Sequence, residues 1–236
     1  MHIIEKQFDI IYNVDIRNIY RNSQDVTIHY EDVTSNSFVQ KCGFLIWTPP
    51  MPELLKHASY ISLDEYQLFK SLSPHVYSAS LMRATNTKRN NPIAYYSETV
   101  SNKINHGVTV ELDIEGALNY DNKNVTQYNE MVKHARIITV LQLGRSVTNK
   151  NKINGIAKNH YKLHLNSTNI DIFNTITWPY MYKWAPHEVS RGNHWKVLDL
   201  QGHHRTWYAG ASVCFESVKS VLEYNNLLLR NLGNIK

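Results

Sequence analysis

One short run of apolar residues constrains the fold more than any other feature of the chain. Residues Cys42-Gly-Phe-Leu-Ile-Trp47 contain no charged side chain, whereas a strand with one face in water alternates apolar and polar residues. An uninterrupted apolar run is typical of a strand that is covered on both faces, as in α/β proteins. The run stops at Thr48-Pro49-Pro50, and proline cannot continue the ladder of a central strand. We therefore predict a buried α/β strand that ends here and leads into a crossover.

The C-terminal part of the chain shows a strand, a turn and a helix in close succession. Residues 205–209 are predicted to form a short strand, Gly210-Ala211-Ser212 a tight turn, and the residues from Val213 onward an amphipathic helix. Small residues at such a turn let a ligand approach the backbone, and a helix N-terminus beside it favours anionic groups. The same arrangement also packs a strand onto a helix, so both interpretations stay open.

Strand and helix patterns alternate along the rest of the chain. Two short helices are predicted within residues 53–72, and further helices at residues 125–134 and 150–165. The aromatic-rich residues 178–195 contain two prolines and are predicted to be irregular. Strands are predicted at Ile10–Ile16, Val26–Tyr30, Val76–Met82, Ile93–Tyr96, Val108–Leu112 and Ile137–Leu143.

Composition argues against several classes of protein. The 236 residues include 25 Lys and Arg and 20 Asp and Glu, but the basic residues are scattered and their runs are short. We therefore expect neither a nucleic-acid partner nor a membrane partner. No stretch resembles a membrane helix or a secretory signal, and the cytoplasm is the default location. The two cysteines have no metal or disulfide spacing.

Two stretches of the sequence point to a known family. Trp195 to Asn225, with Thr-Trp-Tyr-Ala-Gly-Ala-Ser at residues 206–212, resembles the C-terminal FAD-contacting segment of flavin amine oxidase-like oxidoreductases, in particular those of the β-cyclopiazonate dehydrogenase type. Residues 13–21, 26–30 and 42–50 are similar to the middle of the FAD domain in the same family. The resemblance implies FAD as cofactor and hydride transfer from a small organic substrate, for example a nitrogen-bearing one, to the flavin.

The resemblance also carries over individual contacts with the cofactor. In the family the end of the last strand and the turn after it lie against the ribityl chain and ring edge, a valine contacts the adenine through its backbone, and the exit of the middle strand lies near the cofactor. By this resemblance the FAD-contacting residues are Val14, Thr48, Pro49, Gly210, Ala211, Ser212 and Val213. The resemblance identifies no catalytic residue.

The fold implied by the resemblance is α/β. Residues 1–52 and 185–236 would form part of an FAD/NAD(P)-binding, Rossmann-like domain, with a mixed-sheet substrate domain of residues 53–184 inserted between them. Two family features are missing from the sequence. The nine glycines contain no Gly-x-Gly-x-x-Gly spacing, the motif that brings a helix N-terminus to the pyrophosphate. The strand predicted at Val76–Met82 has Ser78 and Ser80 but no lysine, which many amine oxidases hold near the flavin.

These departures leave three functional classes open. The chain would be part of an FAD-dependent enzyme, or a non-catalytic remnant or half of a split flavoprotein that needs a complementary N-terminal FAD-binding segment. As a third class, it would bind a small molecule without flavin. Trp178, Tyr180 and Trp184 would wall a substrate pocket, although aromatic residues at this density more often form a core.

Two histidines and one cysteine are of types that bind metals or act as nucleophiles, but the residues around them do not support such a role. His160 and His164 are spaced to share one helix face, yet no third ligand is evident, so we expect surface histidines and no metal site. Cys214 lies just inside the predicted last helix. We expect it to be a small buried residue rather than a reactive thiol.

Overall fold

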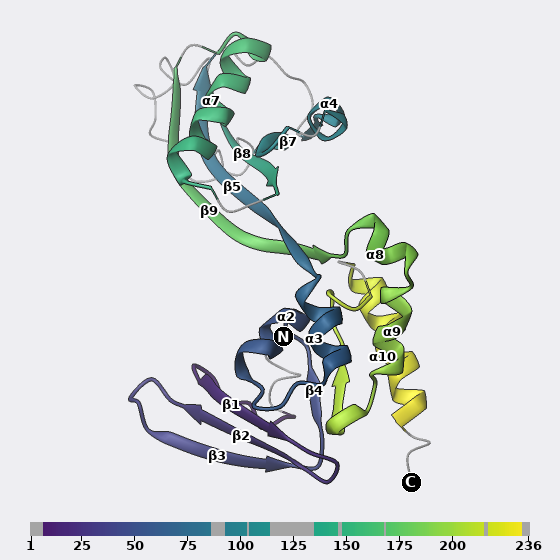
Figure 1. Cartoon of the computed structure of the whole chain (residues 1–236). Helices are drawn as coiled ribbons and strands as arrows, with labels where there is room; N and C mark the ends of the chain where they lie inside the picture. Colours follow the sequence, from purple (N-terminus) through teal and green to yellow (C-terminus); the bar gives the residue numbers. More distant parts are fainter. Residues whose placement is uncertain are drawn as a thin grey trace. The chain divides into compact units, whose positions relative to one another are not determined.

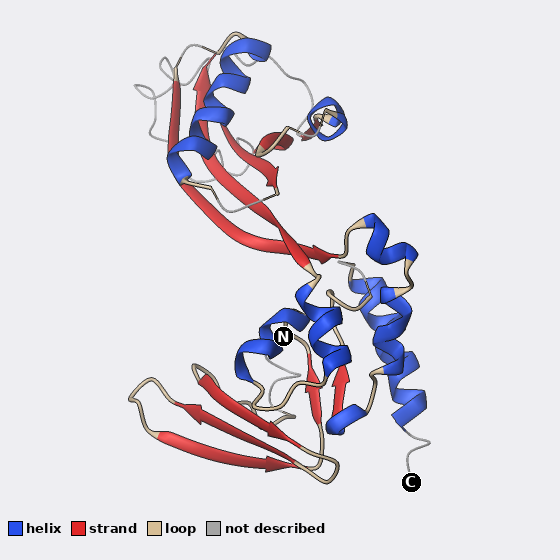
Figure 2. Ribbon diagram, in the orientation of Figure 1, coloured by secondary structure: helices blue, strands red, loops and turns tan. Residues whose placement is uncertain are grey.

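A computed structural model describes residues 7–85, 93–102, 104–113, 135–145, 148–167, 169–214 and 217–232. The described strands form three sheets of a mixed α/β fold (Figures 1 and 2). The chain divides into two compact units, the first made of residues 1–73 and 181–236 and the second of residues 74–180. The helix predicted at residues 125–134 lies outside the described residues.

The first unit contains an antiparallel three-stranded sheet. Its strands are β1 (Asp15–Arg21), β2 (Val26–Glu31) and β3 (Ser37–Cys42), which pair in chain order. The strand predicted from Ile10 begins only at Asp15. Strand β3 was not predicted, because nearly all of its side chains are exposed and it carries no alternation of buried and exposed positions.

A parallel pair of strands forms the second sheet of this unit. Strand β4 (Leu45–Trp47) lies beside β10 (Thr206–Tyr208), with Ile46 opposite Trp207. The prediction of one central strand over residues 42–47 is wrong, because Cys42 ends β3 and only three residues enter β4. The described part of the chain gives β4 no strand neighbour other than β10.

Short helices cover this sheet and close the core of the first unit. They are α2 (Met51–His57), α3 (Leu63–Lys70), α8 (Pro186–Ser190), α9 (Asn193–Asp199) and the 3-10 helix η1 (His203–Arg205). The two helices predicted within residues 53–72 are confirmed as α2 and α3. These residues are predicted to belong to the inserted domain, but Leu54 and Phe69 are fully buried in the same core as Trp47 and Tyr208. The proline run at residues 49–52 therefore marks a helix start rather than a domain boundary.

The last helix starts later than the sequence pattern indicates. Helix α10 spans Val218–Leu232, and Ser217 caps it by accepting a hydrogen bond from the Ser220 N–H at 3.1 Å. The prediction of a helix start at Val213 is therefore wrong. Residues 210–214 form a separate turn, in which the N–H groups of Val213 and Cys214 donate to the Gly210 carbonyl at 3.1 and 3.4 Å.

The second unit is a five-stranded sheet with helix α7 (Lys150–Leu165) against it (Figure 1). Its strand order is β6-β7-β8-β5-β9, and α4 (Ser97–Ser101) follows β6. The helix predicted at residues 150–165 is confirmed, as are the four strands predicted in this unit. The strand bounds are β5 Ser73–Thr85, β6 Ile93–Tyr95, β7 Gly107–Asp113, β8 Ala135–Gly144 and β9 Ile170–Lys183.

The aromatic-rich residues 178–195 are more regular than predicted. Their first part belongs to β9 and their last part to α8 and α9. Pro179 hid the strand from the sequence pattern. Proline is tolerated there because β9 is at the edge of its sheet, where not every backbone N–H needs a partner.

Candidate functional site

The carboxyl ends of the parallel strands β4 and β10 bring two distant parts of the sequence together. The Ala209 N–H donates to the Trp47 carbonyl at 3.0 Å. Strands β4 and β10 therefore end side by side, and the residues that follow them are neighbours. Gly210 follows with φ 88°, and a Cβ on it would lie 2.8 Å from the Thr48 carbonyl oxygen. Ligands of α/β sheets bind at the carboxyl ends of parallel strands. The close backbone approach requires glycine here whether or not a ligand is bound.

The turn after Gly210 holds one unpaired polar atom. Val213 is in the core, whereas Ala211 and Ser212 are half-buried. The Oγ of Ser212 is shielded from solvent and has no hydrogen-bond partner within the described part of the chain. Leaving a buried hydroxyl unpaired costs about 1–3 kcal/mol. Such an atom next to the ends of two parallel strands is suited to a polar ligand.

The other candidate residues of the first unit are placed differently. Thr48 lies against Gly210 at the ends of the paired strands β4 and β10, and Pro49 is the next residue along the chain. Val14 is half-buried and directly precedes β1, in the antiparallel sheet. Cys214 is half-buried, and its Sγ donates to the Gly210 carbonyl at 3.2 Å. Its thiol therefore belongs to the turn and not to the last helix.

A buried ion pair below the turn was not found from the sequence. The Arg21 guanidinium of β1 donates to both carboxylate oxygens of Glu65 on α3, at 3.0 and 3.2 Å. It also donates to the hydroxyls of Thr206 and Tyr208 on β10, at 3.1 and 3.3 Å. The Tyr208 hydroxyl in turn donates to Glu65. The network joins β1, α3 and β10 two residues before Gly210, and only the capping-box spacing of Ser62 and Glu65 gave a sequence signal for it.

The ionisation of this network follows from its burial. The side chains of Arg21 and Glu65 are fully inaccessible to solvent. Burial by itself would raise the pKa of Glu65, but hydrogen bonds from Arg21 and Tyr208 and the Arg21 charge outweigh it and lower that pKa. Burial raises the pKa of Tyr208, and the Glu65 charge raises it further. Glu65 is therefore a buried carboxylate, and Tyr208 stays protonated as its donor.

Gln201 connects β10 to the last helix on the other side. Its Nε2 donates to the Tyr208 carbonyl at 2.9 Å and to the Tyr224 hydroxyl at 2.7 Å. Its Oε1 accepts from the Tyr208 N–H at 2.8 Å. Burial raises the pKa of Tyr224 to about 12. Gln201 thus holds the backbone of β10 at Tyr208, two residues before Gly210, and connects it to α10.

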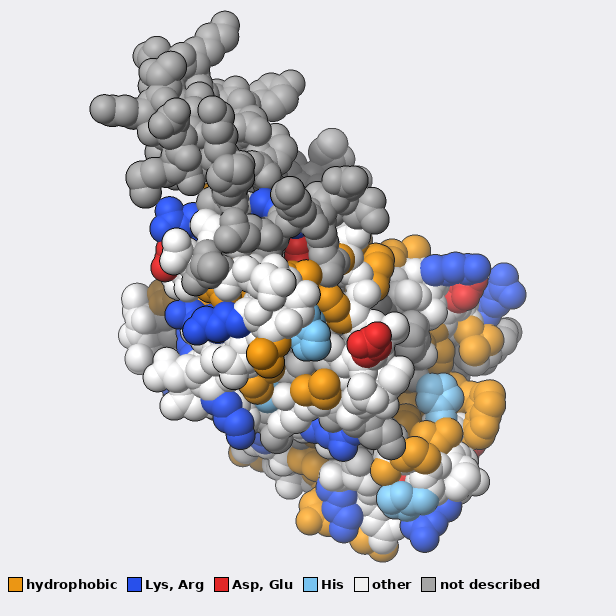
Figure 3. All heavy atoms as spheres, turned by 90° about the horizontal axis from the view of Figure 1, so that it is seen from above, with side chains coloured by type: hydrophobic (Ala, Val, Ile, Leu, Met, Phe, Trp, Pro, Cys, Tyr) orange, Lys and Arg blue, Asp and Glu red, His pale blue; other side chains and the backbone are white. Residues whose placement is uncertain are grey.

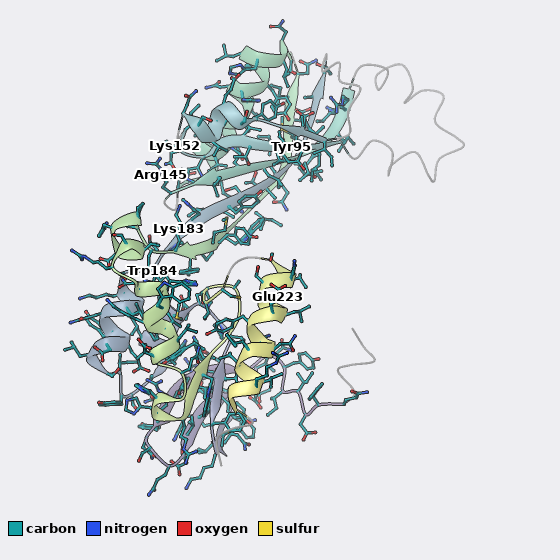
Figure 4. All side chains as sticks on the ribbon, turned by 90° about the vertical axis from the view of Figure 1, so that its right-hand side faces the viewer. Tyr95, Arg145, Lys152, Lys183, Trp184 and Glu223 are labelled. Atoms are coloured by element: carbon teal, nitrogen blue, oxygen red, sulfur yellow. The ribbon has the colours of Figure 1, made fainter. Side chains whose placement is uncertain are left out.

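The aromatic residues predicted to wall a pocket do not share one environment. Trp184 is buried in the first unit (Figure 4), and its Nε1 donates to the Leu68 carbonyl at 3.1 Å. Trp178 and Tyr180 belong to β9 of the second unit, where both rings contact Tyr77 at centroid distances of 5.5 and 5.4 Å. Trp184 therefore has a packing role in the first unit.

Strand β5 carries buried serine hydroxyls and no lysine at Val76–Met82. Ser80 of β5 contacts the Thr175 hydroxyl of β9 at 3.0 Å, and Thr175 donates to Asn154 of α7 at 2.7 Å. Ser78 contacts Thr177 at 3.2 Å in the same way. Hydroxyls that bond one another across two strands hold those strands in register.

A second buried carboxylate lies in the sheet of the second unit. Glu111 accepts hydrogen bonds at 2.8 Å from the hydroxyls of Tyr96 and Tyr161, and Arg136 lies 3.4 Å away. The ring of His160 packs edge-on against Tyr96, with ring centroids 4.4 Å apart. No group of three metal-ligating side chains occurs among the described residues.

The first unit has a charged cleft on its surface. A cleft of about 600 Å³ lies between α3, α8 and α9 and is lined by side chains of both charges, among them Lys70, Glu188 and Lys196. It is formed by these helices and not by the Gly210 turn. On the face shown in Figure 3, lysine and arginine side chains are spread out rather than gathered in one patch. No helix in the described ranges is long and apolar enough to cross a membrane.

Comparisons with known proteins show a likeness of fold. No family model and no curated protein sequence matches this chain. A solved CLA-producing fatty acid isomerase from P. acnes shares 19% identity and a TM-score of 0.68, over 92% of this chain and 47% of that one. A double mutant of putrescine oxidase shares 8% identity and a TM-score of 0.60, over 97% of this chain and 50% of that one. An oxidoreductase from Methanosarcina mazei shares 9% identity and a TM-score of 0.55, over 92% of this chain and 49% of that one.

These likenesses show which fold the chain has and how much of the similar structures it covers. The chain has a mixed α/β fold similar to those of an isomerase and of oxidising enzymes. It spans about half the length of each of these structures.

Proposed function

We propose that this chain forms part of an FAD-dependent oxidoreductase of the flavin amine oxidase type. The observation that carries the proposal is the meeting of Thr48 and Gly210 at the carboxyl ends of β4 and β10. The sequence resemblance assigns these two segments to the flavin, and they come from positions far apart in the chain. The likeness of fold to putrescine oxidase and to an oxidoreductase supports the same class.

The residues at the Gly210 turn fit the central part of a flavin cofactor. No acidic side chain occurs in residues 209–214, so the turn does not repel a phosphate or the electron-rich flavin oxygens. The unpaired Ser212 hydroxyl supplies a donor and an acceptor at the same place. In this proposal Thr48, Pro49 and residues 210–213 face the ribityl chain and ring edge, and the backbone of Val14 contacts the adenine.

The chemistry of the proposed reaction belongs mainly to the cofactor. A bound flavin would accept a hydride from a carbon–hydrogen bond of a small organic substrate. The chain orients the flavin at the Gly210 turn and excludes water with the apolar core beneath it. In the second unit, Trp178 and Tyr180 are proposed to contact the substrate with their rings.

A second candidate function is a non-catalytic remnant or half of a split flavoprotein. It is favoured by the absence of a Gly-x-Gly-x-x-Gly spacing from the 236 residues, because that motif brings a helix N-terminus to the pyrophosphate. The neutral Ser78–Thr177 and Ser80–Thr175 pairs, in place of a lysine, point the same way. For the chain alone we expect no FAD after purification and only weak binding of added FAD.

The decisive experiment compares two serine variants in binding and in stability. Ser212→Ala removes a buried hydroxyl that has no hydrogen-bond partner among the described residues, so the midpoint of urea unfolding should stay the same or rise. FAD affinity, followed by quenching of flavin fluorescence, should fall about tenfold, as for the loss of one hydrogen bond. Ser217→Ala is the matched control, because Ser217 caps α10. It should lose about 1 kcal/mol of stability and keep its FAD affinity.

Each outcome separates the candidates. Equal FAD affinity for Ser212→Ala and the parent chain would mean that the flavin does not contact this turn. No quenching of FAD by the parent chain would favour the remnant. FAD bound tightly and in equimolar amount after purification would show that the chain needs no further phosphate-binding segment.

A further inference from the structure

The cleft between α3, α8 and α9 has the size of a small-molecule site. Its volume of about 600 Å³ falls within the range of roughly 300–1,000 Å³ in which proteins bind small ligands. Helices α3 and α9 pack against each other beside it (Figure 1). Leu68 of α3 and Leu200, the residue after α9, line the cleft and are each 4% exposed, whereas the other lining residues are polar or charged. The cleft therefore offers both apolar and charged contacts.

Helices α3 and α9 run in opposite directions along the cleft. Trp184, just before α8, donates from its Nε1 to the Leu68 carbonyl near the end of α3, at 3.1 Å. Tyr60, just before α3, contacts the ring of His204, beyond α9, with ring centroids 4.9 Å apart. The start of α3 therefore lies by the end of α9, and the end of α3 lies by α8 and the start of α9.

Two carboxylates lie toward the end of the cleft where α3 begins. Asp64 is in the first turn of α3, and Asp199 is the last residue of α9. Neither forms an ion pair with the described part of the chain. A carboxylate at the C-terminal end of a helix is unfavourable, so Asp199 does not stabilise α9. This end of the cleft is suited to a cationic group of a ligand.

Basic side chains predominate toward the other end of the cleft. The Nζ of Lys196 donates to the side chain of Asn193 at 3.0 Å, and Asn193, 5% exposed, donates to Glu188 at 2.6 Å. Glu188 also pairs with Arg191 at 3.5 Å. Lys70 is the last residue of α3, and its ammonium group lies over a tyrosine ring rather than beside a carboxylate. With three basic side chains and one carboxylate, this end is suited to an anionic group.

We propose that this cleft binds a short linear zwitterion whose ammonium and carboxylate groups are about 9 Å apart, a spacing that follows from the rise of an α-helix. Asn193, which holds the Lys196 ammonium, and Asp199 are the first and last residues of α9, so six steps of about 1.5 Å separate them. An extended tripeptide spans roughly 10 Å, whereas the charges of a free amino acid are adjacent. The ligand ammonium would contact Asp64 and Asp199, and its carboxylate would contact Lys196. This site goes beyond the proposed flavin function and does not rest on it.

An NMR titration of the isotope-labelled chain tests the site. The probe is the tripeptide Gly-Leu-Gly with both ends free, for which we expect a Kd of about 1 mM or lower and shifts of amide signals in α3, α8 and α9. Free leucine, the N-acetylated tripeptide and the C-amidated tripeptide should each bind about tenfold more weakly, because each lacks one charge or the spacing. An ω-amino acid, 8-aminooctanoate, has the terminal charges without peptide groups. Equal affinity for it would assign the site to such amino acids, and weaker affinity would assign it to peptides.

Variants test which end of the ligand each charge binds. Asp199→Asn should weaken binding of the free tripeptide about tenfold and leave that of the N-acetylated form unchanged. Lys196→Met should weaken the free tripeptide and leave the C-amidated form unchanged, and Lys70→Met takes its place if the loss of the Asn193 partner unfolds the chain in urea controls. Lys41→Met on the exposed strand β3 is the matched control and should change neither affinity.

Several results would overturn the proposal. They are the absence of saturable shifts up to about 10 mM tripeptide, equal affinity for free leucine, amide shifts confined to residues outside α3, α8 and α9, and an effect of Asp199→Asn no larger than that of Lys41→Met. Ser212→Ala should leave the tripeptide affinity unchanged, because the cleft is formed by other residues. Failure of the cofactor assignment and failure of this site are therefore seen in separate measurements.

Discussion

Removing the Arg21 side chain should destabilise the first unit more than any change at its surface. Arg21→Met keeps most of the side-chain volume but leaves Glu65 as a buried carboxylate without its cation. The guanidinium makes five hydrogen bonds, to Glu65, Thr206, Tyr208 and the Tyr60 carbonyl. Removing one partner of a buried ion pair lowers the free energy of unfolding by about 3–5 kcal/mol. This is a large part of the roughly 5–15 kcal/mol that stabilises a typical domain.

Two further variants make the reasoning refutable. Arg17→Met removes an arginine of the same strand whose side chain is 55% exposed and pairs with Asp15 and Glu31, so it should change stability little. Arg21→Met combined with Glu65→Met removes both charges and should recover much of the loss, because apolar pairs of similar volume replace buried ion pairs well. A double variant no more stable than Arg21→Met would show that the charge of Glu65 is not the cause.

The assay is urea unfolding followed by tryptophan fluorescence, because four of the five tryptophans belong to the first unit. The same assay tests pH dependence. The pKa of Glu65 is lowered in the folded chain, so its contribution is complete above the ordinary value of about 4.3 and is lost as the pH falls below that value. The free energy of unfolding of the parent chain, relative to that of the double variant, should therefore be lower at pH 3 than at pH 7. An unchanged difference would mean that folding does not shift the pKa of Glu65, and a difference that increases toward pH 3 would mean that the fold holds Glu65 protonated.

Two other predictions concern the Gly210 turn and the exposed side chains of Phe44 and Ile46. Gly210→Val introduces a branched residue at φ 88° with a Cβ 2.8 Å from the Thr48 carbonyl, so it should lose about 1–3 kcal/mol in urea unfolding. Gly43→Val, where a Cβ meets no atom within 4 Å, should change little, and equal losses would contradict the close approach. The chain should also bind a hydrophobic dye such as anilinonaphthalene sulfonate. Ile46→Lys should weaken the dye fluorescence by at least a third, whereas unchanged fluorescence would place the dye elsewhere.

Helix α7 and the strands β5 to β8 of the second unit were readable from the sequence, whereas β9 and α4 were not. Helix α7 has the predicted bounds because its buried residues Ile153, Ala157 and Tyr161 recur every four positions. In strands β5 and β8, which are ten or more residues long, buried positions alternate with more exposed ones. A pattern of this length stays recognisable even where one residue departs from it. Short elements were misread, as shown by β4, where only three of six apolar residues form the strand.

The sequence by itself determined that the chain contains a strand, a glycine turn and a helix at its C-terminal end, and the family resemblance added Thr48 as a candidate for the same site as Gly210. Local spacing predicts the strand, the turn and the helix, because turn and helix preferences act over a few residues. Only the tertiary structure decided that the two candidates meet, that the last helix starts at Val218 and that Trp184 belongs to a core. The buried Arg21–Glu65 pair joins residues 44 positions apart. Such a contact is fixed by packing between elements, and neither residue shows it in its own stretch of sequence.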